Sequence, residues 1–171
     1  MADFMPAFER MIQNEGGFKL VNVPADRGGQ TYAGIARNYH PGWPGWRLID
    51  GGDLQNPSLA SLVADFYRTR FWDRLTGDRI DSQMVAESIF DFGVNAGVAT
   101  AAKLAQIVVG ALPDGSIGPV TLEKLNAMDG AQFALKYALA RIARYAEICN
   151  KDRSQSRFLL GWINRTMKEL A

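Results

Sequence analysis

From Asn56 to the C-terminus, the sequence is an almost unbroken succession of helical segments. Apolar residues recur there at the three- and four-residue intervals of amphipathic helices. Glycine and proline mark where most segments begin and end, and Asp129 is expected to cap the long helix that follows it. The expected helices cover residues 58–75, 82–97, 100–110, 119–128, 131–149 and 156–170. This pattern predicts a mainly α-helical fold without an internal repeat, a low-complexity tract or a linker.

One more helix is expected at the N-terminus, between the N-cap Asp3 and a stop at Gly16 and Gly17. After it, short β-prone pieces flank the turn cluster "PADRGG" at residues 24–29. These pieces predict an irregular hairpin, which is the only sheet that the sequence indicates. The fold class is therefore mainly α, with a small β-hairpin near the N-terminus.

The chain of 171 residues is long enough for one compact domain with a sizeable core. No linker divides it, and residues 1–88 alone offer too few helices to enclose a core. We therefore expect a single domain over residues 1–171. Within it we distinguish the sub-regions 1–88, which hold the first helix and the hairpin, and 89–171, which are helical.

Charge and composition exclude several classes of function. The net charge of +1 lacks the electrostatic footprint of a nucleic-acid binder. One histidine, His40, in a Pro/Gly loop is poor evidence for a metal site, and one cysteine, Cys149, allows no internal disulfide. No apolar run approaches the ~18 residues of a membrane span. We expect a monomer with no metal, no cofactor, no nucleic-acid partner and no stable membrane insertion.

The N-terminal segment "MADFMPAFERM" carries charged residues and no apolar core of a secretory signal. We therefore expect the protein to be synthesised in the cytoplasm without a signal peptide. If it works outside the cytoplasm, another component must release it.

The most informative polar residue is Glu15, at the end of the first helix. The apolar stripe of that helix is Phe4, Phe8, Met11 and Ile12, and Glu15 lies about 20° from Phe4 on the helical wheel. Apolar surroundings and the negative end of the helix dipole both favour the protonated carboxyl. A general acid needs that state. Alternatively, Glu15 turns to solvent at a frayed helix end or pairs with an arginine.

Two more polar residues follow on the hairpin. Ten residues separate Glu15 from Asp26, and four separate Asp26 from Thr31. Because the chain reverses here, a hairpin can bring Asp26 and Thr31 back over the end of the first helix. Glycoside hydrolysis uses such a set: an acid for the leaving oxygen, and a second carboxylate that activates water or stabilises the transition state. A threonine hydroxyl can position the water. In the alternative interpretation, residues 26–29 are only a turn.

The segment "EGGFKLVNVPADRGGQTYAGIA", residues 15–36, resembles the signature of glycoside hydrolase family 108. In that signature Glu-Gly-Gly precedes Asp-x-Gly-Gly-x-Thr-x-x-Gly-Ile. The matching positions here are Glu15, Gly16, Gly17, Asp26, Gly28, Gly29, Thr31, Gly34 and Ile35.

Further segments extend the resemblance over nearly the whole chain. Residues 66–75, "FYRTRFWDRL", are similar to the Tyr-Arg-x-x-Tyr-Trp segment of the family, with Phe71 in place of the tyrosine. Residues 90–97, "FDFGVNAG", and 114–125, "DGSIGPVTLEKL", resemble the predicted peptidoglycan-binding region that follows in these proteins. The combination is specific, although no single piece would be.

The resemblance implies a lysozyme-like fold and N-acetylmuramidase activity, in which the β-1,4 bond between N-acetylmuramic acid and N-acetylglucosamine is cleaved. The catalytic glutamate of the family maps onto Glu15, with Asp26 and Thr31 as its partners. Sub-region 1–88 would be catalytic and 89–171 would bind peptidoglycan, or form the structural half of one lysozyme-like body. Many family members are phage endolysins, which implies a partner holin and action in the periplasm or cell wall.

Further candidates for binding the glycan strands are Tyr32 and Tyr39, which could line the cleft. Asp91 and Asn95 lie one helical turn apart in an otherwise apolar helix. Because buried polar groups need partners, this pair either ties helices together or contacts the sugar or the stem peptide.

Aromatic residues in the loop after the hairpin are also ambiguous. Trp43 and Trp46 can plug the core, or their flat apolar faces can stack on sugars.

The sequence is also compatible with two rival functions. A non-catalytic wall-binding or regulatory module could keep the same fold, but it would not need an acid on an apolar stripe. A lytic transglycosylase would use one acid and the muramyl 6-hydroxyl, without a carboxylate that activates water. The effect of Asp26→Asn separates the transglycosylase from the hydrolase.

Overall fold

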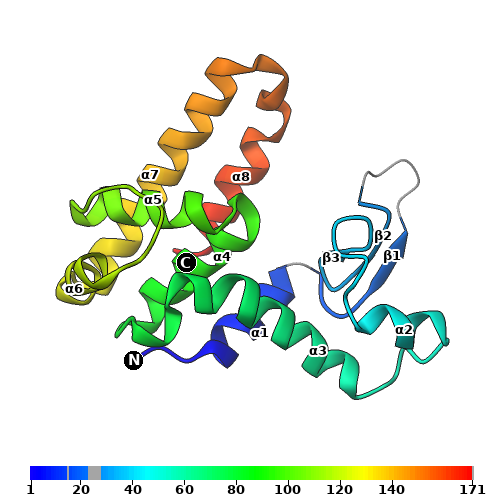
Figure 1. The fold of residues 1–171 in the computed structure, drawn as a ribbon. Coiled ribbons are helices and arrows are strands. Elements are labelled where there is room, and N and C mark those ends of the chain that lie inside the picture. The colour runs from blue at the N-terminus through cyan, green and yellow to red at the C-terminus, as the bar shows by residue number, and fades with distance from the viewer. Residues whose placement is uncertain (15, 23–27, 171) are drawn as a thin grey trace. The chain divides into compact units, whose positions relative to one another are not determined.

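The computed structural model describes residues 1–14, 16–22 and 28–170 and confirms the predicted fold class (Figure 1). Its described residues form eight α-helices and a small antiparallel sheet near the N-terminus. Contacts within the chain group into two compact units, one of residues Phe4–Trp72 and the other of Met1–Asp3 with Asp73–Ala171. The single domain, with its sub-regions 1–88 and 89–171, stays a prediction.

The first unit contains the sheet and the first three helices. They are α1 (Phe4–Asn14), β1 (Leu20–Asn22), β2 (Gln30–Tyr32), β3 (Ile35–Ala36), α2 (Gly45–Asp50) and α3 (Ser58–Tyr67). The predicted apolar stripe of α1 is buried, and Phe4, Phe8, Met11 and Ile12 are each at most 4% exposed. Hydrophobic burial of this one face therefore fixes the orientation of α1 within its unit.

The sheet has three strands in the order β1-β2-β3, all antiparallel. Val21 on β1 and Ala36 on β3 are both paired with Thr31 on β2. The sequence predicted a hairpin, and the short β3 is an addition to it. The connection from β2 holds Ala33 at a φ of 48°, where the Tyr67 hydroxyl donates a hydrogen bond to the Ala33 carbonyl at 2.9 Å. Tertiary packing thus stabilises a positive φ at Ala33, which the local sequence does not predict.

Helix α2 lies inside the segment that the sequence predicts as a loop, so that prediction was wrong for residues 45–50. The helix is only six residues long and has no side-chain cap. It forms because Trp46 and Ile49 are buried. Burial of two large side chains outweighs the weak local preference of a Gly/Pro/Trp-rich segment.

The helix predicted over residues 58–75 is not uniform. Its start is as expected, because Asn56 Oδ1 accepts a hydrogen bond from the Ser58 N–H at 2.9 Å. Regular α-helix ends at Tyr67, and a π-helical turn over Arg68–Trp72 is followed by a short 3₁₀ turn. The wider turn accompanies the complete burial of Trp72, whose ring lies edge-on to Phe4 at 5.7 Å.

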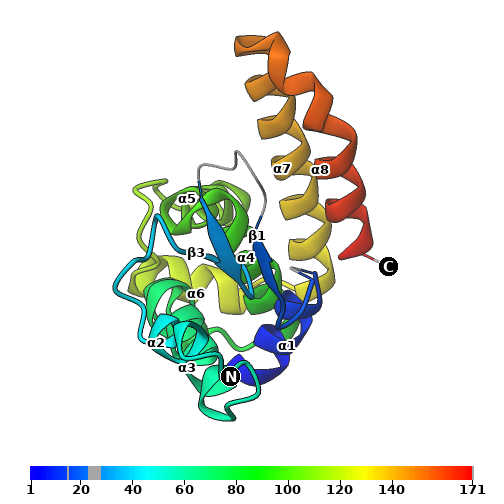
Figure 2. The same ribbon diagram turned by 90° about the vertical axis from the view of Figure 1, so that its right-hand side faces the viewer.

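The second unit is helical. Its main helices are α4 (Gln83–Ala96), α5 (Val98–Val109), α6 (Pro119–Ala127), α7 (Gly130–Lys151) and α8 (Ser156–Lys168). Predicted boundaries are confirmed at several ends: Asp129 accepts from the Gln132 N–H at 2.8 Å at the start of α7, and α5 stops at Gly110. Helices α7 and α8 lie side by side, as both views show (Figure 2).

A buried charged pair joins the last two helices. Arg141 on α7 is 1% exposed, and its Nη1 donates a hydrogen bond to a carboxylate oxygen of Glu169, just after α8. The guanidinium also lies 4.7 Å from the ring centroid of Phe92 on α4. Glu169 and Phe92 therefore compensate a cation that burial would otherwise strongly disfavour.

In the described part of the chain, no helix has both the length and the apolar character needed to cross a membrane.

Candidate active site

The candidate acid, Glu15, lies outside the described residues, but its chain neighbours are described on both sides. Helix α1 ends at Asn14. The Gly17 N–H donates to the Ile12 carbonyl at 2.9 Å, and Gly16 and Gly17 have φ values of 90° and 81°. Glycine tolerates this left-handed backbone, which closes the helix in the manner of a Schellman motif. The predicted helix stop is therefore confirmed.

The second candidate carboxylate, Asp26, also lies outside the described residues, whereas Thr31 is described. Thr31 is half-buried in the middle of β2, and its hydroxyl donates to the Gly29 carbonyl at 3.3 Å. This bond uses the hydroxyl proton and leaves the oxygen lone pairs available as acceptors. Thr31 could therefore still receive a hydrogen bond from a water molecule, as its predicted role requires.

The glycine pair before Thr31 has a structural reason. Gly29 has a φ of 66°, and a Cβ atom there would lie 2.9 Å from the side-chain amide of Asn38. The Asn38 N–H also donates to the Gly28 carbonyl at 3.1 Å. The segment that follows β3 is thus packed directly against the approach to β2, where a Cβ atom would have to displace the Asn38 side chain.

Gly29→Ala is expected to destabilise the protein by about 2 kcal/mol, because alanine adds backbone strain and displaces the Asn38 amide. Gly52→Ala is a matched control, since Gly52 also has a positive φ of 78° but has no atom within 4 Å of an added Cβ. Denaturant unfolding of both variants checks this, and equal losses of unfolding free energy would contradict the packing argument.

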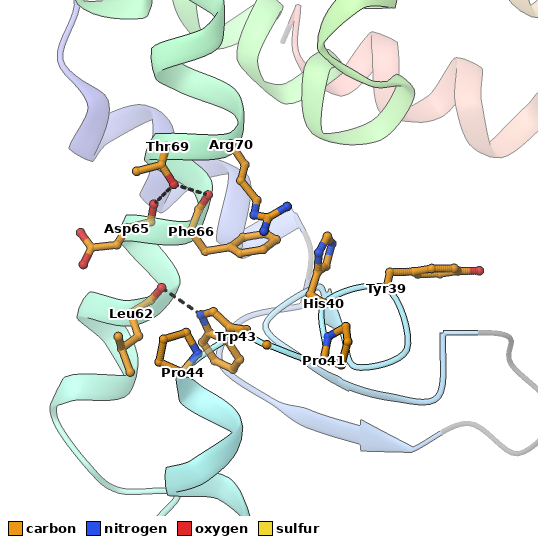
Figure 3. Close-up of a pocket in the computed structure, with 11 residues that line it drawn as sticks. Tyr39, His40, Pro41, Trp43, Pro44, Leu62, Asp65, Phe66, Thr69 and Arg70 are labelled. Atoms are coloured by element: carbon orange, nitrogen blue, oxygen red, sulfur yellow. Dashed lines mark hydrogen bonds between the residues drawn. The ribbon is translucent and has the colours of Figure 1, made fainter.

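The two candidate tyrosines are placed differently. Tyr32 is 4% exposed and its ring stacks on Trp43 at 6.0 Å, so burial raises the pKa of its hydroxyl. Tyr39 is 64% exposed and extends away from Phe66 (Figure 3). Of the two, only Tyr39 presents its ring to solvent in this structure.

Tyr39 stands at the edge of a hollow of about 470 Å³ in the first unit (Figure 3). The hollow is lined by the loop Tyr39–Pro44, by the end of α3, and by Thr69 and Arg70. The ring of His40 meets Phe66 edge-on at 4.8 Å, and the Arg70 guanidinium lies 5.1 Å from the Phe66 centroid. An aromatic wall with polar groups at its rim suits a polar organic ligand such as a sugar.

The lining of this hollow includes the ionisable side chains of His40, Asp65 and Arg70, which differ in charge and position. Partial burial, with a further contribution from the positive charge of Arg70, lowers the pKa of His40 below its ordinary value. His40 is therefore neutral near pH 7 and offers one donor and one acceptor nitrogen. The carboxylate of Asp65 points away from Arg70 (Figure 3). The rim thus presents a cation and a neutral imidazole on the same side of Phe66.

The sequence identified this region only in part. Leu62, Phe66 and Arg70 recur at four-residue spacing within the helix predicted over residues 58–75, which places them on one helix face, but no sequence pattern marks that face as the wall of a hollow. As a lone histidine in a Pro/Gly loop, His40 carries no sequence signal of a ligand-binding role.

The structure decides between the alternatives for the tryptophans. Trp43 and Trp46 are 7% and 3% exposed. Their indole N–H groups donate to the carbonyls of Leu62 at 3.2 Å and His40 at 2.8 Å. Both rings therefore plug the core, and they hold the Tyr39–Pro44 loop in place.

The remaining candidates, Asp91 and Asn95, belong to the second unit. Arg165 on α8 donates to both carboxylate oxygens of Asp91, at 3.0 and 3.3 Å. The Asn95 side-chain amide donates to the Asp91 carbonyl at 2.7 Å. This arrangement is the helix-tying alternative, since it joins α4 to α8. A contact with substrate stays a prediction for both residues.

Among residues 1–14, 16–22 and 28–170, no three His, Cys, Asp or Glu side chains gather as a metal site would require.

Comparison with known families gives two matches that together span most of the chain. The family model of glycosyl hydrolase 108 matches residues 8–97, and that of a predicted peptidoglycan domain matches residues 100–167. The chain belongs to the glycosyl hydrolase 108 family. The resemblance to this family is thereby confirmed, and the two matches support a peptidoglycan hydrolase.

A solved structure with a similar fold is that of SagA from Brucella abortus. The two chains are 29% identical, and the match covers 98% of this chain and 91% of that one with a TM-score of 0.74. No significant match is found among curated proteins.

Proposed function

We propose that this protein is an N-acetylmuramidase that cleaves the β-1,4 bond between N-acetylmuramic acid and N-acetylglucosamine, with Glu15 as general acid. The family match over residues 8–97 carries the proposal, because it spans both Glu15 and the segment 26–31. The buried stripe of α1 and the glycine stop after Asn14 support it further. In the sequence, Glu15 directly follows the last residue of this helix, whose buried face is apolar.

The proposed chemistry assigns one step to each polar group. Glu15 gives its proton to the leaving glycosidic oxygen, and Asp26 activates a water molecule or stabilises the positively charged transition state. Thr31 accepts a hydrogen bond from that water. The hollow beside Phe66 contributes to holding the glycan strand, with Tyr39, His40 and Arg70 as its polar contacts.

The first test is the production of new reducing ends from purified peptidoglycan. A glycosidase creates one reducing sugar at each cleavage, whereas an amidase or a peptidase creates none. The proposal predicts reducing ends that increase together with the release of soluble material. Release of soluble material without reducing ends would contradict it.

Asp26→Asn is expected to lower the hydrolytic rate on the order of 10²-fold, because a general base contributes about that much. Asp53→Asn on the exposed loop before α3 makes the same change of charge and serves as the control. Rates of reducing-end formation measure the effect. An unchanged rate of reducing-end formation in Asp26→Asn would remove Asp26 from the mechanism.

We also propose that the protein acts in the periplasm or cell wall after release through a holin-type pore, since peptidoglycan lies outside the inner membrane. Expression with and without a holin tests this. Lysis is expected only when both proteins are present, and efficient lysis without a holin would argue for another route.

A further inference from the structure

A second hollow, of about 550 Å³, runs between α5 and α7 in the helical unit. Both helices line it with the same spacing of residues i, i+3, i+4 and i+7, which places the lining residues on one face of each helix. The α5 residues are Thr100, Lys103, Leu104 and Ile107, and the α7 residues are Ala140, Ala143, Arg144 and Glu147. We call this hollow the α5–α7 groove.

Small and branched alkyl groups form the apolar part of the α5–α7 groove. Ala140 and Ala143 contribute only methyl groups on the α7 side, so that wall is shallow. Ile107 on the α5 side is 61% exposed, although it is a large apolar residue. Exposed alkyl surface next to a concave wall is typical of a binding site for small apolar groups.

Charged groups of both signs stand around this apolar surface. Lys103 and Arg144 contribute two cations and Glu147 contributes one carboxylate. Among the residues that the structure describes, neither Arg144 nor Glu147 forms a salt bridge. The carboxylate of nearby Asp114 accepts hydrogen bonds from Gln106 and Ser116, and these bonds account for most of the lowering of its pKa. The charge of Lys103 makes only a minor contribution to that lowering.

The lining favours a peptide over a sugar. Sugar sites use flat aromatic faces, and none of the described residues that line the α5–α7 groove is aromatic. A short peptide with methyl side chains, carboxylates and one amine would match the alkyl surface, the two cations and Glu147 respectively. The stem peptide of peptidoglycan has this chemistry, since it combines alanines, a glutamate with a free carboxylate and a diamino acid.

We propose that the α5–α7 groove binds the stem peptide of peptidoglycan, with Lys103 and Arg144 on its carboxylates and Glu147 on the amine of its diamino acid. The inference rests on peptidoglycan being the substrate, as proposed above. It deepens that proposal by assigning the second half of the chain a ligand of its own. All residues that line the α5–α7 groove fall within residues 100–167, which match the predicted peptidoglycan domain.

The test is calorimetric titration of the whole chain with a synthetic tetrapeptide, L-Ala–γ-D-Glu–diaminopimelate–D-Ala. Arg144→Ala is expected to weaken binding about tenfold, as loss of a hydrogen bond between charged groups does. Arg153→Ala is the matched control, because this exposed arginine lies in the 3₁₀ turn after α7 and does not line the groove. It should bind as the wild type does.

A second variant tests whether Glu147 contacts the amine of the diamino acid. Glu147→Gln should weaken binding of the diaminopimelate peptide, and it should affect less a peptide with alanine at the third position. Circular dichroism confirms that each variant is folded. No binding by the wild type, or equal binding by Arg144→Ala and Arg153→Ala, would overturn the inference. Self-association through the groove, or perturbation of the groove by peptide-free glycan in NMR spectra, would overturn it as well.

The outcome is separable from that of the proposed function. If the wild type cleaves glycan strands stripped of stem peptides but binds no tetrapeptide, the muramidase proposal stands and the groove inference fails. If it binds the tetrapeptide but forms no reducing ends on any glycan, the groove inference stands and the muramidase proposal fails.

Discussion

Glu15→Gln is expected to lower the rate of peptidoglycan hydrolysis about 10³-fold, the middle of the range for a positioned general acid. Glutamine has the same shape as the protonated carboxyl but cannot give up a proton to the leaving oxygen. Binding of the glycan should therefore survive while the bond-breaking step does not. Initial rates at saturating substrate separate these two effects.

The matched control for this variant is a glutamate on α1. Glu9→Gln removes a carboxylate from the exposed face of α1, six residues before Glu15 in the sequence. It should leave the rate unchanged, because position 9 is on the side of α1 opposite to the buried stripe. If both variants kept the wild-type rate, the general acid would have to be another residue.

Arg141→Met is expected to lower the free energy of unfolding by up to about 3–5 kcal/mol, the usual cost of breaking a buried ion pair, at a pH above 7 where Glu169 is ionised in the wild type. The substitution removes the cation that Glu169 faces and leaves that carboxylate, whose side chain is 14% exposed, without its partner. Denaturant titration measures the effect. Arg144→Met, three residues further along α7 and without a salt bridge in the described residues, should change stability by less than about 0.5 kcal/mol.

A double variant tests the same pair from the other side. Replacing both partners, as in Arg141→Met with Glu169→Leu, removes the unpaired buried charge. It should recover much of the lost unfolding free energy, since apolar replacements of buried pairs are often neutral or better. Strictly additive losses in the double variant would show that the two residues do not act as a pair.

The pH dependence of this effect has a defined sign. Burial, opposed by Arg141 and assisted by the carboxylate of Asp91, raises the pKa of Glu169 from its ordinary 4.5 to about 7. The folded state therefore holds more protons than the unfolded state between these values, and stability falls as pH rises towards 7. Without Arg141 the pKa rises further. The loss in Arg141→Met should therefore grow between about pH 7 and 9.

The helices could be predicted from sequence where a stripe and a cap agree. Asp129 and Gly110 mark such ends, and both are confirmed. Elements that depend on distant partners could not be predicted. Helix α2 forms because Trp46 is buried in the core. The turn at Ala33 is stabilised by a hydrogen bond from the hydroxyl of Tyr67, 34 residues away. No local pattern carries that information.

The candidate site also has a part that the sequence predicts and a part that it does not. The chemistry of Glu15, Asp26 and Thr31 could be inferred from residue types, their spacing and the resemblance to the family. The hollow beside Phe66 could not, because it requires His40 and Arg70 to meet across segments 30 residues apart. The role of Trp43 also needed the structure, since its burial and the bond from its indole N–H to the Leu62 carbonyl distinguish a core plug from a sugar platform.

The most direct test of the muramidase proposal is mass spectrometry of the fragments released from purified peptidoglycan by the wild type and by Glu15→Gln. The proposal predicts soluble fragments that end in reducing N-acetylmuramic acid, and none from the folded variant. Anhydro-muramic ends would identify a transglycosylase instead. Fragments ending in reducing N-acetylglucosamine, or no fragments from a folded wild type that binds the wall, would contradict the proposal.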